Sequence, residues 1–409
     1  MSLLTDLSGV NAAQTAIDTI GNNIANVDTT GFKSSDAEFA ALYGSALALA
    51  PGQGVDTSAL EQSFAEGTVS QTGNPLDVAI EGNGFFQLQS GSGTVYSRDG
   101  SFQINSSGQL VNAAGNQVLG FAPAASGAAS VSGSLQPIVI NQANLPPAAT
   151  SSLAIGVNLP SSAAPINTKT QPFSPTNPKS YNESTTATVY DSVGSSLSLT
   201  TYFTQVAGSG KPDQWQTHWQ LTSPSGTAIA SGAGPTLVFN QNGQLASGSG
   251  TLKIAGLPGG AANLNIAENF SGTGLSGLAF GVNSITPNGS SGGQLTGVQI
   301  GSDGVVTGQY SNGATKAFGT IALANFTNPQ GLVPTAGNAW AATTASGSPT
   351  SGAAGTGALG QLEAGALEGS NVDLSTQLVD LITAQQAYQA NVQSINTEQQ
   401  NFQRLLTIQ

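Results

Sequence analysis

Two apolar seams at the chain's ends constrain the fold most strongly. Near the C-terminus, apolar residues recur at alternating intervals of three and four, the spacing of a heptad seam along an α-helix. The seam positions, two of them filled by glutamine, are Leu374, Leu378, Leu381, Gln385, Tyr388, Val392, Ile395, Gln399, Phe402 and Leu406. This segment contains neither Gly nor Pro, and Ser370, Asn371 and Asp373 before it suit a helix N-terminus. We therefore expect a helix from about residue 374 to residue 406.

The N-terminus repeats this pattern until Gly31 interrupts it. The seam positions are Leu3, Leu7, Val10, Gln14, Ile17 and Ile24, with Gly21 in a further gap. An ordinary helical hairpin would bury both seams within one chain. However, burying so few apolar side chains does not offset the conformational entropy of ordering either helix alone. We therefore expect both ends to become ordered only when packed against each other and against neighbouring copies, with the seam glutamines helping to fix the register.

Between the two ends, short β-prone segments alternate with turn signals. Residues 76–121 predict a β-meander. A second β-rich region follows, with a hairpin turn at Ser192–Ser195 and a strand that places Trp215, Thr217 and Trp219 on one buried face. The predicted fold class is α+β, mainly β: discontinuous terminal helices form a coiled-coil-like core domain, and two β-rich domains are inserted in series.

This pattern predicts four parts, each except the last built from two separate stretches of the chain. They are a terminal helical core domain (1–35 with 370–409), extended connecting segments (36–75 with 358–369), an inner β domain (76–146 with 291–357) and an outer β domain (147–290).

Composition narrows the classes of function. The chain has no cysteine, which excludes disulfides, thiolate metal sites and a cysteine nucleophile. With only 8 Lys and Arg against 21 Asp and Glu among 409 residues, nucleic acid and anionic membranes are poor partners. We find no cleavable signal peptide and no apolar run that would span or insert into a membrane. Such scarcity of charge suits a surface covered by copies of the same chain, although a glycine-rich extracellular β protein has a similar composition.

The candidate catalytic motifs in the sequence do not indicate a catalytic site. The two G-x-G-x-x-G matches, 272–277 and 355–360, are expected by chance among 53 glycines and do not link a strand to a helix. The G-x-S-x-G match at 289–293 lies in a loop, and the only histidine, His218, alternates with tryptophans on a strand. Neither zinc nor calcium has a plausible ligand set. We expect no enzymatic activity, metal or cofactor, although a carboxylate pair such as Glu183 and Asp191 stays open.

Six sequence blocks, in order, resemble the bacterial flagellar rod and hook family of axial proteins, and within it the hook proteins. They are "GNNIANVDTTGFK", "NPLDVAIEGNGFFQL", "YSRDGSFQINSSGQLVNAAGNQVLGF", "ATVYDSVGSSLSLTTYF", "IALANFTNPQGLVPTAGNAW" and "GALEGSNVDLSTQLVDLITAQQAYQANVQSINT". The resemblance implies a non-enzymatic subunit that polymerises into a short curved tube and transmits torque from rod to filament as a universal joint. Its implied partners are further copies of itself, the hook cap, rod and hook-filament junction proteins, and the flagellar type III export apparatus, which needs no cleavable signal.

In this reading the terminal helices form the inner tube, and the motif after the first helix carries the chain into an extended crossing toward the β domains. Gly31 gives backbone freedom there, beside Phe32, while Asn22, Asn23 and Asn26 satisfy backbone groups between subunits. Gln377 departs from the family pattern where an acidic residue is expected, and Gln386 where Arg is common, so amide contacts replace an ion pair. Three alternatives stay open: a distal rod protein, which lacks the insertion at 147–290, a secreted β-rich adhesin, and a carbohydrate-active enzyme.

Overall fold

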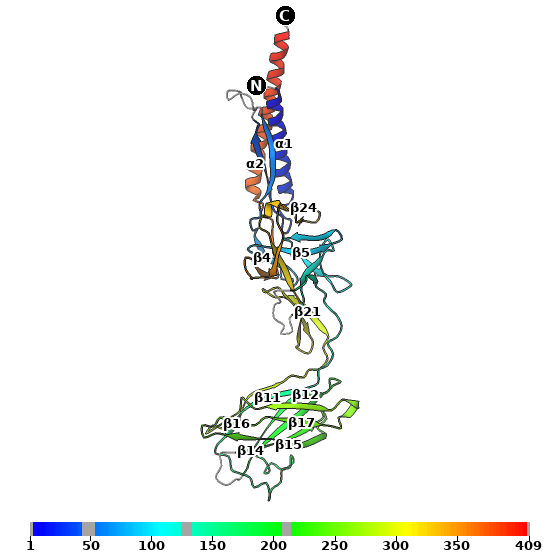
Figure 1. The fold of residues 1–409 in the computed structure, drawn as a ribbon, viewed down its shortest axis with the longest axis vertical. Helices are drawn as coiled ribbons and strands as arrows, with labels where there is room; N and C mark the ends of the chain where they lie inside the picture. Colours follow the sequence, from blue (N-terminus) through cyan, green and yellow to red (C-terminus); the bar gives the residue numbers. More distant parts are fainter. Residues whose placement is uncertain (1–2, 43–53, 124–132, 207–213, 407–409) are drawn as a thin grey trace. The chain divides into compact units, whose positions relative to one another are not determined.

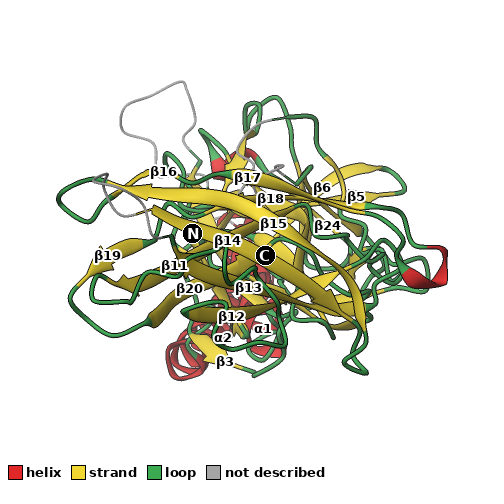
Figure 2. Ribbon diagram, turned by 90° about the horizontal axis from the view of Figure 1, so that it is seen from below, coloured by secondary structure: helices red, strands yellow, loops and turns green. Residues whose placement is uncertain are grey.

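The computed structural model describes residues 3–42, 54–123, 133–206 and 214–406. Within these residues, α1 (Leu3–Ala25) and α2 (Leu374–Leu406) stand at the two ends of the chain, and strands and loops make up most of the remainder (Figures 1 and 2). The predicted fold class, mainly β with two terminal helices, is confirmed.

The chain divides into two compact units. Unit 1 contains both chain ends and comprises residues 1–142, 297–309 and 315–409, whereas unit 2 comprises residues 143–296 and 310–314. The finer division into four parts stays a prediction.

Both helices begin and end for local reasons. Helix α2 starts where the sequence predicts, because the Asp373 carboxylate accepts the backbone N–H of Thr376 at 2.9 Å and caps the first turn. Helix α1 ends at Ala25, ahead of Gly31, where the N–H of Asn26 bonds the carbonyls of both Asn22 and Asn23 and the chain leaves the helix in a turn. At about 1.5 Å per residue, the 23 residues of α1 and the 33 of α2 span roughly 35 and 50 Å.

After α1 the chain does not cross directly to the β regions. Strands β1 (Ser35–Ala41) and β2 (Val55–Gln62) form an antiparallel hairpin alongside α1 (Figure 1). The Asn23 side chain explains this course, because its amide donates to the carbonyl of Ser35 at 2.8 Å and accepts the Ser35 N–H at 3.0 Å. The expected extended crossing is therefore replaced by a strand that runs back along the helix.

The β part of unit 1 is built on a twelve-stranded sheet among the described residues, whose main path is β21-β22-β23-β9-β5-β6-β25-β24. Its strands are β5 (Phe85–Ser90), β6 (Gly93–Ser97), β7 (Phe102–Ile104), β8 (Leu110–Asn112), β9 (Gln117–Phe121), β10 (Gln136–Pro137), β21 (Leu295–Ile300), β22 (Val305–Tyr310), β23 (Thr315–Asn325), β24 (Val333–Thr335), β25 (Ala339–Ala341) and β26 (Thr350–Ala353). A short 3-10 turn, Pro329–Gly331, precedes β24. Two small ribbons pair the outgoing chain with the returning chain: β3 (Val69–Gln71) with β28 (Ala366–Glu368), and β4 (Val78–Glu81) with β27 (Gln361–Ala364).

The prediction of a simple meander over residues 76–121 is wrong in its pairing. All the expected strands form, but β6 does not pair with β7, and β9 returns to lie beside β5. The reason lies in the turn between β6 and β7, where the Arg98 side chain is buried and Gly100 packs against the backbone of Val78. The Gly100 carbonyl accepts the N–H of Val78 at 3.1 Å, so the chain passes against β4 instead of forming a hairpin.

Unit 2 consists of two five-stranded sheets around one apolar core (Figure 2). One sheet contains β11 (Ser152–Pro160), β17 (Gly250–Ile254), β18 (Leu264–Asn269), β19 (Gly274–Ser276) and β20 (Gly281–Pro287), and the other β12 (Glu183–Tyr190), β13 (Ser196–Gln205), β14 (Gln214–Thr222), β15 (Ala228–Phe239) and β16 (Leu245–Ser247). A 3-10 turn, Pro258–Gly260, joins β17 to β18. The predicted hairpin at Ser192–Ser195 is confirmed, and so is the buried face of Trp215, Thr217 and Trp219 on β14.

Candidate assembly surface and ionic junction

The contact between α1 and α2 contains several small and polar side chains. Ser394 donates its hydroxyl to the Asp6 carboxylate at 3.0 Å, and Asn23 donates its amide to the Gln377 side-chain oxygen at 3.0 Å. Between these bonds Gly9 touches Asn391 so closely that a Cβ at Gly9 would lie 2.8 Å from the Asn391 Nδ2. Polar groups buried in this way must be paired, so the contacts set one register between the helices.

Large apolar side chains project away from this contact. Phe402 is 65% exposed, and Leu7, Leu374 and Leu378 are each between 44% and 48% exposed. The other exposed apolar side chains on the two helices are Leu4, Val379 and Ile382. We call these seven residues the exposed helix face. A surface of this kind on a protein is typical of an interaction site rather than of a finished exterior.

The predicted seam positions fall into two groups in the single chain. Half-buried positions are Val10, Ile17, Ile24, Leu381, Tyr388, Val392 and Ile395; exposed positions are Leu7, Gln14, Leu374, Leu378, Gln385, Gln399 and Phe402. The side chains of Leu3 and Leu406 lie outside the described residues. The role of these positions in contacts between subunits stays a prediction.

Sequence reasoning found only part of the contact that pairs the helices within the chain. The α2 side of this contact follows a second seam, which shares Leu381, Tyr388 and Ile395 with the predicted one and adds Gln377, Ala384, Asn391 and Glu398. On α1, Asp6, Gly9, Ala13 and Asn23 were missed. This second seam also alternates intervals of four and three. It is hard to see in the sequence because four of its seven positions are polar or alanine.

The asparagine motif after α1 makes its bonds within the chain. Asn26 donates its side-chain amide to the Asn22 carbonyl at 2.9 Å and accepts the Thr29 hydroxyl at 3.1 Å. Asn23 holds Ser35, as described above, whereas Asn22 is exposed and Phe32 is half-buried. Gln377 makes an amide contact with Asn23 of the same chain, and the expected amide contacts between subunits stay a prediction.

Gly31 occupies a position that only glycine fits. Its φ is +66°, in the left-handed region, and a Cβ would lie 2.6 Å from the Asp99 nitrogen and 2.7 Å from the Arg98 carbonyl carbon. The Gly31 N–H donates to the Glu368 carbonyl at 2.7 Å. This glycine therefore allows the outgoing chain to pass tightly between the returning chain and the turn after β6.

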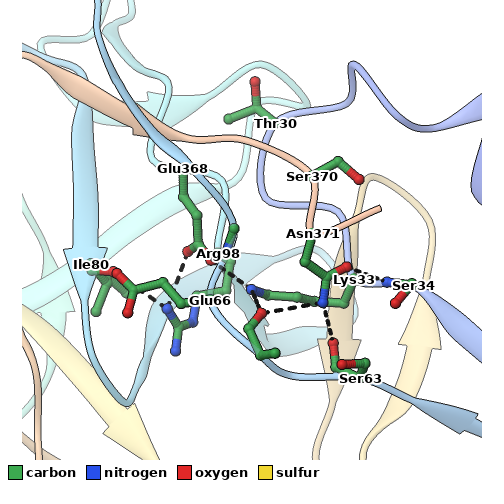
Figure 3. A network of polar contacts seen from close by, with 12 residues as sticks. Thr30, Lys33, Ser34, Ser63, Glu66, Ile80, Arg98, Glu368, Ser370 and Asn371 are labelled. Atoms are coloured by element: carbon green, nitrogen blue, oxygen red, sulfur yellow. Dashed lines mark hydrogen bonds and ion pairs between the residues drawn. The ribbon is translucent and has the colours of Figure 1, made fainter. Parts of the chain in front are cut away.

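Directly beside Gly31 lies a buried ionic cluster, which we call the junction network: Lys33, Arg98 and Glu368 (Figure 3). The Lys33 ammonium donates to Glu368 Oε1 at 2.6 Å and to the Ala65 carbonyl at 2.7 Å. Arg98 Nη1 lies 3.1 Å from Glu368 Oε2, and its Nη2 donates to the Gly82 carbonyl at 2.8 Å. Burial lowers the pKa of Lys33, and the Glu368 carboxylate opposes that shift.

The junction network was also missed, although each member lies in a block already singled out. Lys33 ends "GNNIANVDTTGFK", Arg98 lies in "YSRDG", and Glu368 lies in "GALEGSNVD". Because Glu368 and Lys33 are 335 positions apart, no spacing rule could have paired them.

Other candidate chemistry finds little support. Glu183 begins β12 and Asp191 follows its last residue, so these carboxylates stand about 25 Å apart at the usual rise per strand residue and cannot act as a pair. Among the described residues, no group of three or more His, Cys, Asp or Glu side chains is placed to hold a metal ion. None of the described helices combines the length and the apolar character needed to cross a membrane.

Comparison with known families gives the class of protein. Matches cover residues 3–33 (flagella basal body rod protein), 79–163 (flagellar hook protein FlgE/F/G D1 domain), 158–290 (flagellar basal body protein FlaE D2 domain) and 363–408 (flagellar basal body rod FlgEFG protein C-terminal). The fold and these matches define a flagellar rod or hook axial protein.

Individual relatives identify the family within that class. Flagellar hook protein FlgE of Salmonella typhimurium is 40% identical over 416 residues, that of Escherichia coli K12 is 41% identical over 416 residues, and both alignments cover 100% of each chain. A crystal structure of Helicobacter pylori flagellar hook protein FlgE2 has a similar fold, with a TM-score of 0.56 at 14% identity over 72% of this chain and 99% of that one. The chain belongs to the flagellar hook protein family and is a structural subunit of the hook.

Proposed function

We propose that copies of this subunit pack around a common axis through the exposed helix face, with α1 and α2 forming the inner wall of the hook tube. The observation that supports this most directly is the inverted polarity of the helix pair. Its internal contact uses Asp6, Asn23 and Gln377, whereas Leu4, Leu7, Leu374, Leu378 and Phe402 are exposed. A helical hairpin built to be stable alone would place these groups the other way round.

The same proposal explains when the two terminal helices become ordered. Within one chain the predicted seams bury little apolar surface, so the helices gain most of their stabilisation from neighbouring copies. We take the contact to be heterologous, because repeated heterologous contacts that do not close produce an open helical assembly such as a tube. The tube bends as a universal joint and transmits torque from rod to filament.

The finer partners follow from membership of the family. We propose that the subunit contacts the hook cap, the rod and the hook-filament junction proteins, and that it reaches its site through the flagellar type III export apparatus without a cleavable signal.

The test replaces one leucine of the exposed helix face. We expect Leu378→Ser to raise the protein concentration needed for tube assembly about tenfold, because burying a half-exposed leucine is worth somewhat more than 1 kcal/mol. Assembly is followed by sedimentation, and the tubes are imaged by negative-stain microscopy. Leu278→Ser, which changes an equally apolar but 72% exposed residue of unit 2, is the matched control. Assembly of Leu378→Ser at the wild-type concentration would refute the proposal.

A further inference from the structure

The junction network lies where the two terminal helices meet the β part of unit 1. Lys33 follows the end of α1 at Ala25, and Glu368 ends β28, shortly before α2 begins at Leu374. Arg98 comes from the turn after β6. Figure 3 shows the Glu368 carboxylate between Lys33 and Arg98. The Glu368 side chain therefore connects the segment after α1 to the turn after β6 of the sheet.

Among the described residues, Glu368 is the carboxylate that forms ion pairs with both cations, whereas Glu66 acts on Lys33 only through its charge. Lys33 and Glu368 side chains are both 0% exposed and that of Arg98 is 4% exposed. The two cations also donate hydrogen bonds to the backbone carbonyls of Ala65, Ile80 and Gly82. Burying a cation without a counter-ion is strongly unfavourable. If Glu368 is missing, the most favourable response is for the junction to open and hydrate both cations.

Further bonds join the returning chain to the outgoing chain at the same place. Glu368 Oε1 accepts the Gly67 N–H at 3.0 Å, and the Glu368 carbonyl accepts the Gly31 N–H at 2.7 Å. Asn371 accepts the Ser34 N–H at 2.7 Å and donates to the Ser63 carbonyl at 2.8 Å. Residues 368–371 thus close over segments 31–34 and 63–67. Since Asn23 and Gln377 pair just beyond this closure, it also brings the first turn of α2 to the last turn of α1 in register.

We propose that Glu368 is a positioning residue for assembly: its closure onto Lys33 and Arg98 makes the helix pair competent to assemble, so a chain in which this junction is open is not competent even though both helices are present. A chain with an open junction keeps both cations hydrated and leaves the end of α1 apart from the start of α2. Such a chain does not present the exposed helix face in the correct register. The inference rests on the proposed function insofar as the helix pair is the assembly surface.

The test uses the full-length chain with Glu368→Gln, which keeps the side chain's shape and removes its charge. Hydrogen exchange is measured first on dilute, unassembled subunits. We expect the Gly31 and Gly67 amides to exchange roughly a hundredfold faster than in the wild type, because a broken buried ion pair opens the junction locally. Unit 2 should keep its wild-type unfolding midpoint. The matched control, Glu363→Gln, removes a partly exposed carboxylate from the same returning segment and should leave both amides protected.

A second variant separates positioning from a general loss of contacts. If unpaired charge opens the junction, then adding Lys33→Met to Glu368→Gln should recover part of the amide protection and lower the assembly concentration toward the wild-type value. A purely structural role predicts that the double variant is worse than the single one, and this result would overturn the inference. So would wild-type amide protection in Glu368→Gln.

The two proposals fail separately. Hydrogen exchange on dilute subunits tests the junction without any assembly, whereas Leu378→Ser tests the exposed helix face with the junction intact. If Leu378→Ser assembles normally while Glu368→Gln loses amide protection, the assembly surface is wrong and the conditional closure stands. If Leu378→Ser fails and Glu368→Gln assembles normally with protected amides, the assembly surface stands and the inference is wrong.

Discussion

Glu268→Gln is the substitution for which the structure gives the clearest direction of change in the stability of unit 2. Glu268 occupies an inward position of β18, after Leu264 and Ile266, and is 2% exposed. Neither carboxylate oxygen has a hydrogen-bond partner among the described residues. The Thr217 hydroxyl, near Gly234, donates to the Pro235 carbonyl at 2.6 Å. Gly234 lies beside both groups, since a Cβ there would collide with the Thr217 hydroxyl oxygen and lie 3.5 Å from Glu268 Oε2.

Burial raises the pKa of Glu268 from 4.5 to about 7. Between these two values the folded state holds a proton that the unfolded state has released. Unit 2 is therefore most stable below about pH 4.5 with respect to this group, and it loses stability as the pH rises to about 7. At 1.36 kcal/mol per pH unit, the loss over this interval is about 3 kcal/mol.

The assay is urea unfolding of unit 2, followed by the fluorescence of Trp215 and Trp219, with Trp340→Phe in every variant to remove the signal of unit 1. We expect Glu268→Gln to be more stable than its parent by about 3 kcal/mol at pH 8 and to be nearly equal to it at pH 4. Asn265→Gln, at an outward position of the same strand, is the control. An equal difference at both pH values would show that ionisation of Glu268 is not the cause.

Three further predictions concern single positions. Gly31→Val should destabilise unit 1 by more than about 2 kcal/mol in urea unfolding and block tube assembly, because a branched side chain fits neither the backbone angle nor the space; normal polymerisation would contradict this. Burial against Phe173 lowers the pKa of His218, so this group makes unit 2 less stable as the pH falls below 6.5, opposite in sign to Glu268; in the Glu268→Gln variant unit 2 should therefore lose stability below pH 6.5, and adding His218→Phe should abolish that loss in the same unfolding assay. Gly9→Cys with Asn391→Cys should form an intrachain disulfide in assembled tubes, read on a non-reducing gel, whereas an interchain bond would mean that the helices pair between copies.

The sequence predicts the elements of this fold better than their pairing. The heptad spacing and the Asp373 cap locate α2, and the alternation around Trp215 gives the buried face of β14, because both signals are local. The packing of α1 against α2 was predicted, but the residues that make the contact were not. Helix α2 carries two seams that share Leu381, Tyr388 and Ile395, and the polar and alanine positions that complete the seam used within the chain give no apolar signal.

The junction network shows the same limit at longer range. Lys33, Arg98 and Glu368 each lie in a recognisable block, but the sequence does not reveal that three distant turns converge on one carboxylate. Gly31 was singled out correctly as a position of backbone freedom. Its actual requirement, close approach to Arg98 and Asp99, depends on the same convergence and became apparent only in the structure.

The division between polar and apolar seams gives a physical reason why the two helices can adopt one register within a chain and also bind neighbouring copies strongly in a polymer. Hydrogen bonds such as Asn23 to Gln377 and Ser394 to Asp6 depend on direction, so they select a register while adding little net stability. Apolar contacts depend on area and tolerate small sliding, so they suit interfaces between copies that must hold while a curved tube rotates. With the polar seam placed inside the subunit and the exposed helix face placed outside, the chain keeps its apolar surface for the neighbours, where repetition along the tube makes it most effective.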